Sequence, residues 1–196
     1  GGGIGLDFST LTVEVDMTPE NIFAHGTLTA AMNEAPRSEA GLALGDYYIY
    51  NSNPQRARQA FADTWDLLSQ NEESLDVRRE QLEQVVTLKQ DALPRYVSPD
   101  TRASGDDRTD PLLQGSVTIS YGVSTRGRAA NVKLVEAQPP EFESMIRTVQ
   151  REVRRRFYRP RMVDGQVVAT PDLTLVHKFF YRQSDLDAAR AAQVQD

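Results

Sequence analysis

The chain contains no cysteine among its 196 residues, which excludes disulfide bonds, thiolate catalysis and cysteine-based zinc sites. Histidine is almost as scarce, because His25 and His177 are the only two and lie far apart in the sequence. Neither has a histidine or carboxylate four residues away, the spacing at which a helix brings two metal ligands together. The sequence therefore predicts no metal site and gives both histidines a structural role.

Long apolar runs and the common catalytic motifs are also missing. No stretch of about eighteen or more apolar residues could cross a membrane as a helix. The glycines at the start of the chain lack the lysine and Ser/Thr of a phosphate loop, and no Gly-x-Ser-x-Gly nucleophile elbow occurs. Paired acids such as Glu72 and Glu73 lie in polar segments, where we expect them to be solvated. We predict that the chain is not an enzyme and that it needs no cofactor.

What the chain does have is an ordinary globular composition with an uneven charge. Hydrophobic residues make up 39% and charged residues 26%, which is typical of a folded protein. Residues 1–110 hold 19 acidic and 9 basic side chains, a balance of −10, whereas residues 111–196 hold 9 acidic and 13 basic, a balance of +4. This asymmetry indicates two units with different surfaces.

The pattern of apolar residues changes from helical to alternating across a polar stretch that contains two prolines and a glycine. We therefore predict an α+β fold in which a helical part precedes a strand-rich part. The expected order is an unreadable N-terminal segment (1–37), a helical domain (38–96), a linker or ordered loop (97–111), a ββαβ module (112–182) and a tail (183–196).

Three helices are predicted in the helical domain, at residues 39–50, 54–70 and 74–93. Asn53 is a natural N-cap, and Pro54 suits the first position of the second helix. The first two helices resemble a tetratricopeptide repeat, in which small residues let paired helices approach closely and aromatic residues fill the remaining space. The residues at the intervals of that repeat, which we expect to pack together, are Leu44, Gly45, Tyr48, Ala57 and Phe61.

The strand-rich module begins with Val117, Ile119, Tyr121 and Val123 in strict alternation with small or polar residues, the pattern of a half-buried strand. A second strand is predicted at residues 131–137. A helix over residues 141–157 carries an apolar stripe that ends at Phe157, and it should lie across one face of the sheet. A last strand is predicted at residues 172–181. This layout is typical of a binding module.

The predicted helix and the residues after it are rich in arginine, which raises the question of nucleic-acid binding. Such binding favours a basic domain with exposed aromatic residues, whereas this chain is acidic and Phe157 belongs to the buried stripe. We therefore expect a solvated face, or contact with acidic residues of the N-terminal half, and no nucleic-acid partner. The residues concerned are Arg147, Arg151, Arg154, Arg155, Arg156, Arg159 and Arg161.

The module also resembles a known family, the C-terminal domain of TonB, the periplasmic energy transducer of Gram-negative bacteria. The stretches that carry the resemblance are residues 115–123, 127–135, 139–143 and 157–168, of which the last is the most specific. They cover about a third of the chain. One departure is Arg156, which lies where many relatives carry a tryptophan at the end of the helix.

The resemblance implies a periplasmic protein that binds an extended peptide, the TonB box of an outer-membrane transporter, by strand addition. The inner-membrane anchor that energy transduction requires is expected to lie outside this sequence. In the family the acceptor is the last strand, which predicts partner binding at Asp172, Leu173, Thr174, Leu175, Val176, His177, Lys178 and Phe179. An alternative remains open, in which the helical domain is a periplasmic scaffold for a protein partner and the TonB-like module serves for docking or homodimerisation.

Overall fold

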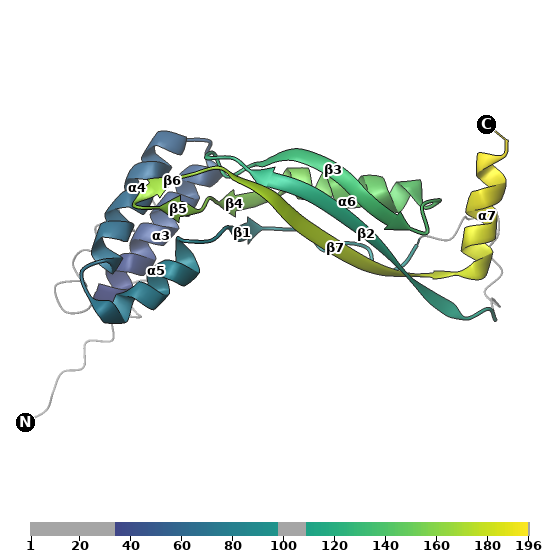
Figure 1. Ribbon diagram of the computed structural model, residues 1–196, viewed down its shortest axis with the longest axis horizontal. Helices are drawn as coiled ribbons and strands as arrows, with labels where there is room; N and C mark the ends of the chain where they lie inside the picture. Colours follow the sequence, from purple (N-terminus) through teal and green to yellow (C-terminus); the bar gives the residue numbers. More distant parts are fainter. Residues whose placement is uncertain (1–33, 98–108, 196) are drawn as a thin grey trace, which may run out of the picture. The chain divides into compact units, whose positions relative to one another are not determined.

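The computed structural model describes residues 34–97 and 109–195, and their fold is α+β (Figure 1). The expectations for residues 1–33, including His25, lie outside the described residues. No helix in the described part of the chain is both long and apolar enough to cross a membrane. The elements are α3 (Glu34–Tyr50), α4 (Pro54–Leu68), η1 (Glu72–Ser74), α5 (Leu75–Gln81), β1 (Val86–Lys89), β2 (Leu112–Val123), β3 (Ala129–Gln138), α6 (Glu143–Arg155), β4 (Phe157–Arg159), β5 (Met162–Val163), β6 (Gln166–Val167), β7 (Thr170–Arg182) and α7 (Gln183–Gln193).

The chain forms two compact units, and one of them is built from two separate stretches of sequence. The helical unit contains the residues up to Val86 together with Arg159–Val168. The sheet unit contains Thr87–Tyr158 and Ala169–Asp196. The predicted boundaries had placed residues 159–168 inside the C-terminal module, but by their contacts they group with the helices. The chain thus passes between the units three times.

Helices α3 and α4 pack closely because glycine lines the contact. A Cβ atom added to Gly45 would lie 2.2 Å from the Phe61 ring, and one added to Gly41 would lie 2.1 Å from the Thr64 hydroxyl. Phe61 and Ala57 are buried, and Leu44 and Tyr48 are partly buried. The Asn53 side chain accepts a hydrogen bond from the Arg56 amide, so the cap expected at the start of α4 is present.

The third predicted helix, over residues 74–93, is wrong in its second half. Helix α5 ends at Gln81, and residues 86–89 form strand β1, which pairs with β4. The run Val85-Val86-Thr87 is β-branched and favours an extended backbone. The pairing with β4 is a long-range contact that helical periodicity alone could not reveal.

Residues 159–168 contribute a β-hairpin to the helical unit. Strands β5 and β6 are joined by Asp164 and Gly165, which both have positive φ angles, of 49° and 78°. A Cβ atom on Gly165 would contact the Trp65 indole at 3.4 Å, and the Arg78 guanidinium lies 4.2 Å from the centroid of the same indole. The Met162 amide donates a hydrogen bond to the Leu82 carbonyl at 2.7 Å. The hairpin is therefore packed on α4 and on the end of α5.

Arg159 fixes the hairpin to α3 through a buried ion pair. Its guanidinium donates two hydrogen bonds to the Asp46 carboxylate, at 2.9 and 2.7 Å, and two more to the side chain and carbonyl of Gln81. The side chain of Arg159 is only 7% exposed and that of Asp46 is 18% exposed. This contact fulfils the expectation that part of the arginine-rich stretch meets an acidic residue of the N-terminal half.

The sheet unit is built around a three-stranded antiparallel sheet that α6 covers on one face (Figure 1). The strand order is β3-β2-β7, with the 12-residue strand β2 in the centre. Alternate residues of β2 face the helix, as their alternation predicted. The buried core between the layers consists of Val117, Ile119, Phe142, Met145, Val149, Val153, Phe179 and Leu186.

The end of α6 differs from the prediction, and as a result Tyr158, instead of the predicted Phe157, is the aromatic residue buried in the core. The helix ends at Arg155, two residues before the predicted end, and Phe157 begins strand β4. Phe157 is only half-buried and lies beneath the Arg128 guanidinium, 4.2 Å from its ring centroid. Tyr158 is fully buried, and its hydroxyl donates to the Val153 carbonyl at 3.2 Å. Burial raises the pKa of the Tyr158 phenol well above its usual range.

The difference in burial between Tyr158 and Phe157 can be tested by mutation. Tyr158→Ala should lower the free energy of unfolding by roughly 3–5 kcal/mol, the usual cost of removing a buried aromatic ring. Phe157→Ala should cost only about 1–2 kcal/mol, because its ring is only partly buried and lies outside the buried core. Denaturant titration of both variants would decide the point, and a larger effect for Phe157 would place the wrong ring in the core.

A second prediction concerns the buried ion pair. Arg159→Ala leaves the Asp46 carboxylate without its partner, so the free energy of unfolding should fall by about 3–5 kcal/mol. Arg151→Ala is the matched control, because Arg151 is exposed and its loss should cost less than about 1 kcal/mol. Equal effects of the two variants on the far-UV unfolding transition would show that the pair contributes nothing.

Candidate functional site

The three-stranded sheet has two outer edges, and they differ in regularity. Strand β3 pairs with β2 through two register shifts, one between Thr118 and Ile119 and one between Ser120 and Gly122. Asn131, within β3, has a positive φ of 52°. Such bulges twist an edge and interrupt its row of hydrogen-bonding groups, so β3 is a poor template for another strand.

Strand β7 has an unbroken register with β2 from Leu173 to Arg182. Apart from a bridge at Phe180, the edge of β7 that faces away from β2 has no strand partner in the described part of the chain. At Phe180 itself, the amide donates to the Arg95 carbonyl at 2.8 Å, and the carbonyl accepts from the Val97 amide at 3.0 Å. The backbone groups of Phe180 therefore point outward, away from β2.

This observation fixes the direction of every other backbone group in the regular part of β7. In an antiparallel strand, successive residues direct their N–H and C=O groups to opposite sides. Counting back from Phe180 in steps of two, Lys178, Val176 and Thr174 present their backbone groups to the open edge. The residues between them, Leu175 and His177, bond to β2.

The alternation divides the predicted partner-strand residues into two sets. The side chains of Leu173, Leu175, His177 and Phe179 face α6 and are partly or fully buried. Those of Asp172, Thr174, Val176 and Lys178 are exposed on the other face, with Val176 at 56%. Asp172 has a φ of 57°, so the regular edge begins just after it. The open backbone and the exposed side chains thus belong to the same residues.

The segment before the sheet covers one end of this edge. Tyr96 forms a parallel bridge with Phe180, and their rings lie 5.8 Å apart. The Pro94 carbonyl lies 2.7 Å from the His177 imidazole Nε2, which accounts for this histidine as a structural residue stacked on Phe179. Leu93 and Val97 pack against the core. The edge available to a partner therefore runs from Thr174 to Lys178.

Sequence reasoning missed this covering segment, because it had no periodic pattern and was assigned partly to the third helix and partly to the linker. The only signal was Leu93-Pro94, since proline excludes a helix and favours an extended neighbour.

Within the described residues, no group of three or more histidines and acids could hold a metal ion. The arginines divide as well: Arg156 and Arg159 are buried in ion pairs, whereas Arg147, Arg151, Arg154 and Arg155 are exposed.

Two carboxylates hold helix α7, which follows directly after β7, through hydrogen bonds. Asp110 accepts a hydrogen bond from the Ser184 amide at 2.8 Å, and Glu141 accepts one from the Arg190 guanidinium at 2.9 Å. The Ser184 amide holds the pKa of Asp110 below its usual range, and the Arg190 hydrogen bond does the same for Glu141. Leu186 adds the apolar anchor of the helix.

No family model matches this chain, and no curated protein matches its sequence. The site is therefore defined by its own geometry: a regular sheet edge, covered at one end, on a sheet whose one face is packed against α6.

The two carboxylates make the docking of α7 sensitive to acid. Because their folded-state pKa values are lowered, their contribution is present at neutral pH and is lost as the pH falls below the usual pKa range of carboxyl groups. Amide hydrogen exchange should show α7 losing protection before the β2–β7 ladder does. The double variant Asp110→Asn/Glu141→Gln should show the same loss at pH 7. Equal protection of α7 and the ladder down to pH 3 would contradict this.

Proposed function

We propose that this chain is a non-enzymatic protein-binding module that captures an extended peptide by strand addition along the outer edge of β7. The proposal rests mainly on one observation, the open row of backbone groups from Thr174 to Lys178 on a strand whose register in this stretch is unbroken. Backbone hydrogen bonds would supply the affinity, and the exposed side chains beside them would select among sequences.

The resemblance to the TonB C-terminal domain supports a more specific form of the proposal. The order of two strands, a helix and a last strand, with the last strand at an edge of the sheet, is the arrangement that the resemblance implied. In this form the partner is the TonB box of an outer-membrane transporter, and the site of action is the periplasm.

The departure at Arg156 is compatible with the proposal. Where relatives carry tryptophan, Arg156 is 8% exposed and its guanidinium bonds to Glu152 at 3.2 Å. The same Glu152 oxygen accepts the Asp91 amide at 2.6 Å. A buried ion pair thus occupies the position beside the end of α6, and the change does not lie in β7.

The scaffold alternative rests on a separate observation, the glycine-mediated packing of α3 on α4. In that reading the helices hold the partner and β7 serves to pair two copies of the chain. The two proposals differ in which residues a partner contacts, so mutation of the edge discriminates between them.

Val176→Pro is the sharpest test of the edge. Proline at this position removes an N–H group that points outward and leaves the β2–β7 ladder intact, so the module should stay folded and lose the peptide. Leu175→Pro, in contrast, removes a group bonded to β2 and should unfold the sheet. Val135→Pro is the matched control, because Val135 is an exposed residue in the bulged strand β3.

The measurement is titration of the ¹⁵N-labelled chain with TonB-box peptides, followed by NMR. We expect shifts in Thr174–Lys178 with micromolar or weaker affinity, because an extended peptide loses conformational entropy when it is ordered. Val176→Pro should weaken binding by about tenfold or more, and Val135→Pro should not. Equal binding by the wild type and Val176→Pro would exclude the edge. Self-association that Val176→Pro abolishes would favour the pairing of two copies.

A further inference from the structure

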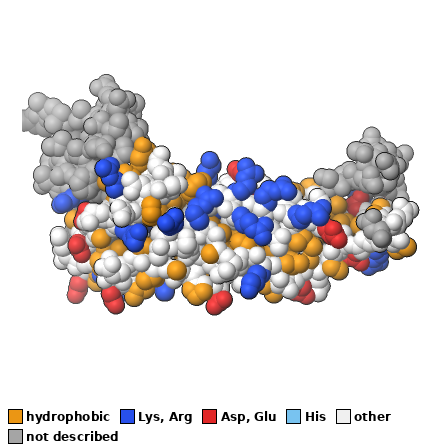
Figure 2. All heavy atoms as spheres, turned by 90° about the horizontal axis from the view of Figure 1, so that it is seen from above, with side chains coloured by type: hydrophobic (Ala, Val, Ile, Leu, Met, Phe, Trp, Pro, Cys, Tyr) orange, Lys and Arg blue, Asp and Glu red, His pale blue; other side chains and the backbone are white. Residues whose placement is uncertain are grey.

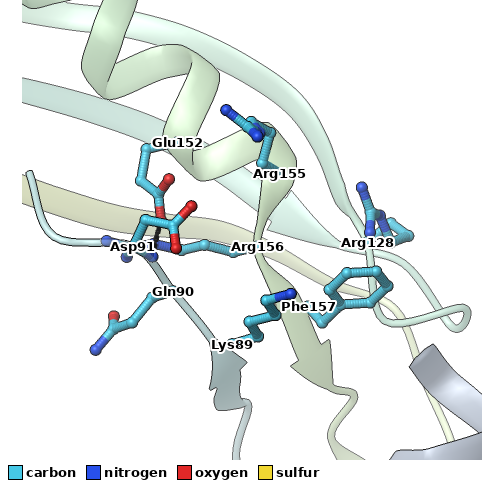
Figure 3. A pocket seen from close by; sticks show the side chains of 8 residues that line it. All are labelled: Lys89, Gln90, Asp91, Arg128, Glu152, Arg155, Arg156 and Phe157. Atoms are coloured by element: carbon cyan, nitrogen blue, oxygen red, sulfur yellow. Dashed lines mark hydrogen bonds and ion pairs between the residues drawn. The ribbon is translucent and has the colours of Figure 1, made fainter.

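The sheet unit contains a second candidate site, which offers charged side chains where the β7 edge offers backbone groups. A hollow of about 270 Å³ lies where the end of α6, the β2–β3 turn and the residues after β1 come together (Figure 3). Its lining consists of Lys89, Gln90, Asp91, Arg128, Glu152, Arg155, Arg156 and Phe157. Four of these eight side chains are cationic and two are acidic.

The buried part of the lining is already neutral. Arg156 and Glu152 form an ion pair in which both side chains are only 9% exposed. The Glu152 oxygen that binds Arg156 also accepts the Asp91 amide, as the dashed lines in Figure 3 mark. This pair lies in the hollow with no net charge, so the rim cations set the charge of the site.

Three cations remain around the rim, and they come from three different segments. Lys89 ends β1, Arg128 belongs to the β2–β3 turn, and Arg155 ends α6. Neither Lys89 nor Arg155 forms an ion pair with another residue in the described part of the chain. With Asp91 as the only acid outside the buried pair, the rim has an excess of two positive charges.

One of the three cations is held in place before any ligand arrives. The Arg128 guanidinium stacks on the Phe157 ring, 4.2 Å from its centroid, and donates a hydrogen bond to the Arg154 carbonyl at 3.2 Å. An arginine fixed on an aromatic ring loses less conformational entropy on binding and keeps its remaining N–H groups available. Partly buried Phe157, which the sequence had assigned to the core, therefore has a role in the hollow.

We infer that this hollow binds a phosphate group. A carboxylate offers two oxygens in one plane, whereas a phosphate offers oxygens in several directions and so can meet donors that approach from three segments. Guanidinium and ammonium groups are the usual protein ligands of phosphate. The exposed arginines of α6 extend the positive region beyond the hollow, and Figure 2 shows Lys and Arg side chains gathered on that face. The group is carried either by a soluble phosphate compound or by the headgroup of an anionic lipid.

The test compares two double variants that remove the same charge. Lys89→Gln/Arg155→Gln removes two rim cations that form no ion pair among the described residues, so the fold should be preserved. Arg151→Gln/Arg154→Gln removes two exposed arginines of α6 that do not line the hollow. It leaves the Arg154 carbonyl, and hence the position of Arg128, unchanged. The NMR spectrum of each variant in the absence of ligand verifies its fold.

Two probes separate the sources of phosphate. Inorganic phosphate is titrated at constant ionic strength, with the amides of Gln90, Asp91 and Phe157 as reporters. Vesicles of phosphatidylglycerol are compared with vesicles of phosphatidylcholine by sedimentation of the full chain. We expect the rim variant to weaken binding by about tenfold or more and the control variant by less than about threefold, since exposed charges outside the hollow act only through screened attraction.

Each outcome decides the inference. Shifts of the three reporter amides by inorganic phosphate, lost in the rim variant, support a soluble phosphate ligand. Binding to phosphatidylglycerol vesicles alone, with the same dependence on Lys89 and Arg155, supports a lipid headgroup. Equal loss in the two double variants would show diffuse attraction without a site. The absence of both reporter shifts and vesicle binding would overturn the inference, and neither result would bear on peptide capture at β7.

Discussion

The sheet unit depends on the alternation along β2. One set of its residues directs apolar side chains, including Val117 and Ile119, toward α6 and bonds through the backbone to β7. The intervening residues carry small polar side chains on the open face and pair with β3. Because side-chain direction and backbone direction share a period of two, burying one face also decides which groups of β7 are free. The core and the candidate binding edge are thus two results of one register.

The helical unit depends on a contact of a different kind, made across more than a hundred residues of sequence. Arg159 reaches Asp46 with two hydrogen bonds and Gln81 with two more. A buried guanidinium is tolerated only when its donors are used, and here four bonds use most of them. These four bonds offset part of the desolvation cost of burying the charge.

Much of the fold could be predicted from local patterns. The alternation of β2 and β7, the apolar stripe of α6 and the Asn53-Pro54 start of α4 are each set by residues close in sequence, and each is present. The errors lie where a distant contact overrides a local pattern. Residues 86–89 continue a helical stripe but pair with β4, and Phe157 extends the stripe of α6 while Tyr158 occupies the core. The candidate edge followed from the position of the last strand. The direction of its backbone groups and the covering segment at Pro94–Val97 required coordinates, because neither depends on residue type.

The passage of the chain between the units has a consequence for the order of synthesis. Helices α3, α4 and α5 are complete once Gln81 has been made, yet the hairpin that packs on Trp65 and carries Arg159 is made only after β2, β3 and α6. Until residue 168 has left the ribosome, Asp46 lacks its partner and the Leu82 carbonyl lacks the Met162 amide. The first unit in the sequence is therefore finished late, and its two pieces must find each other around a segment that has already begun to fold.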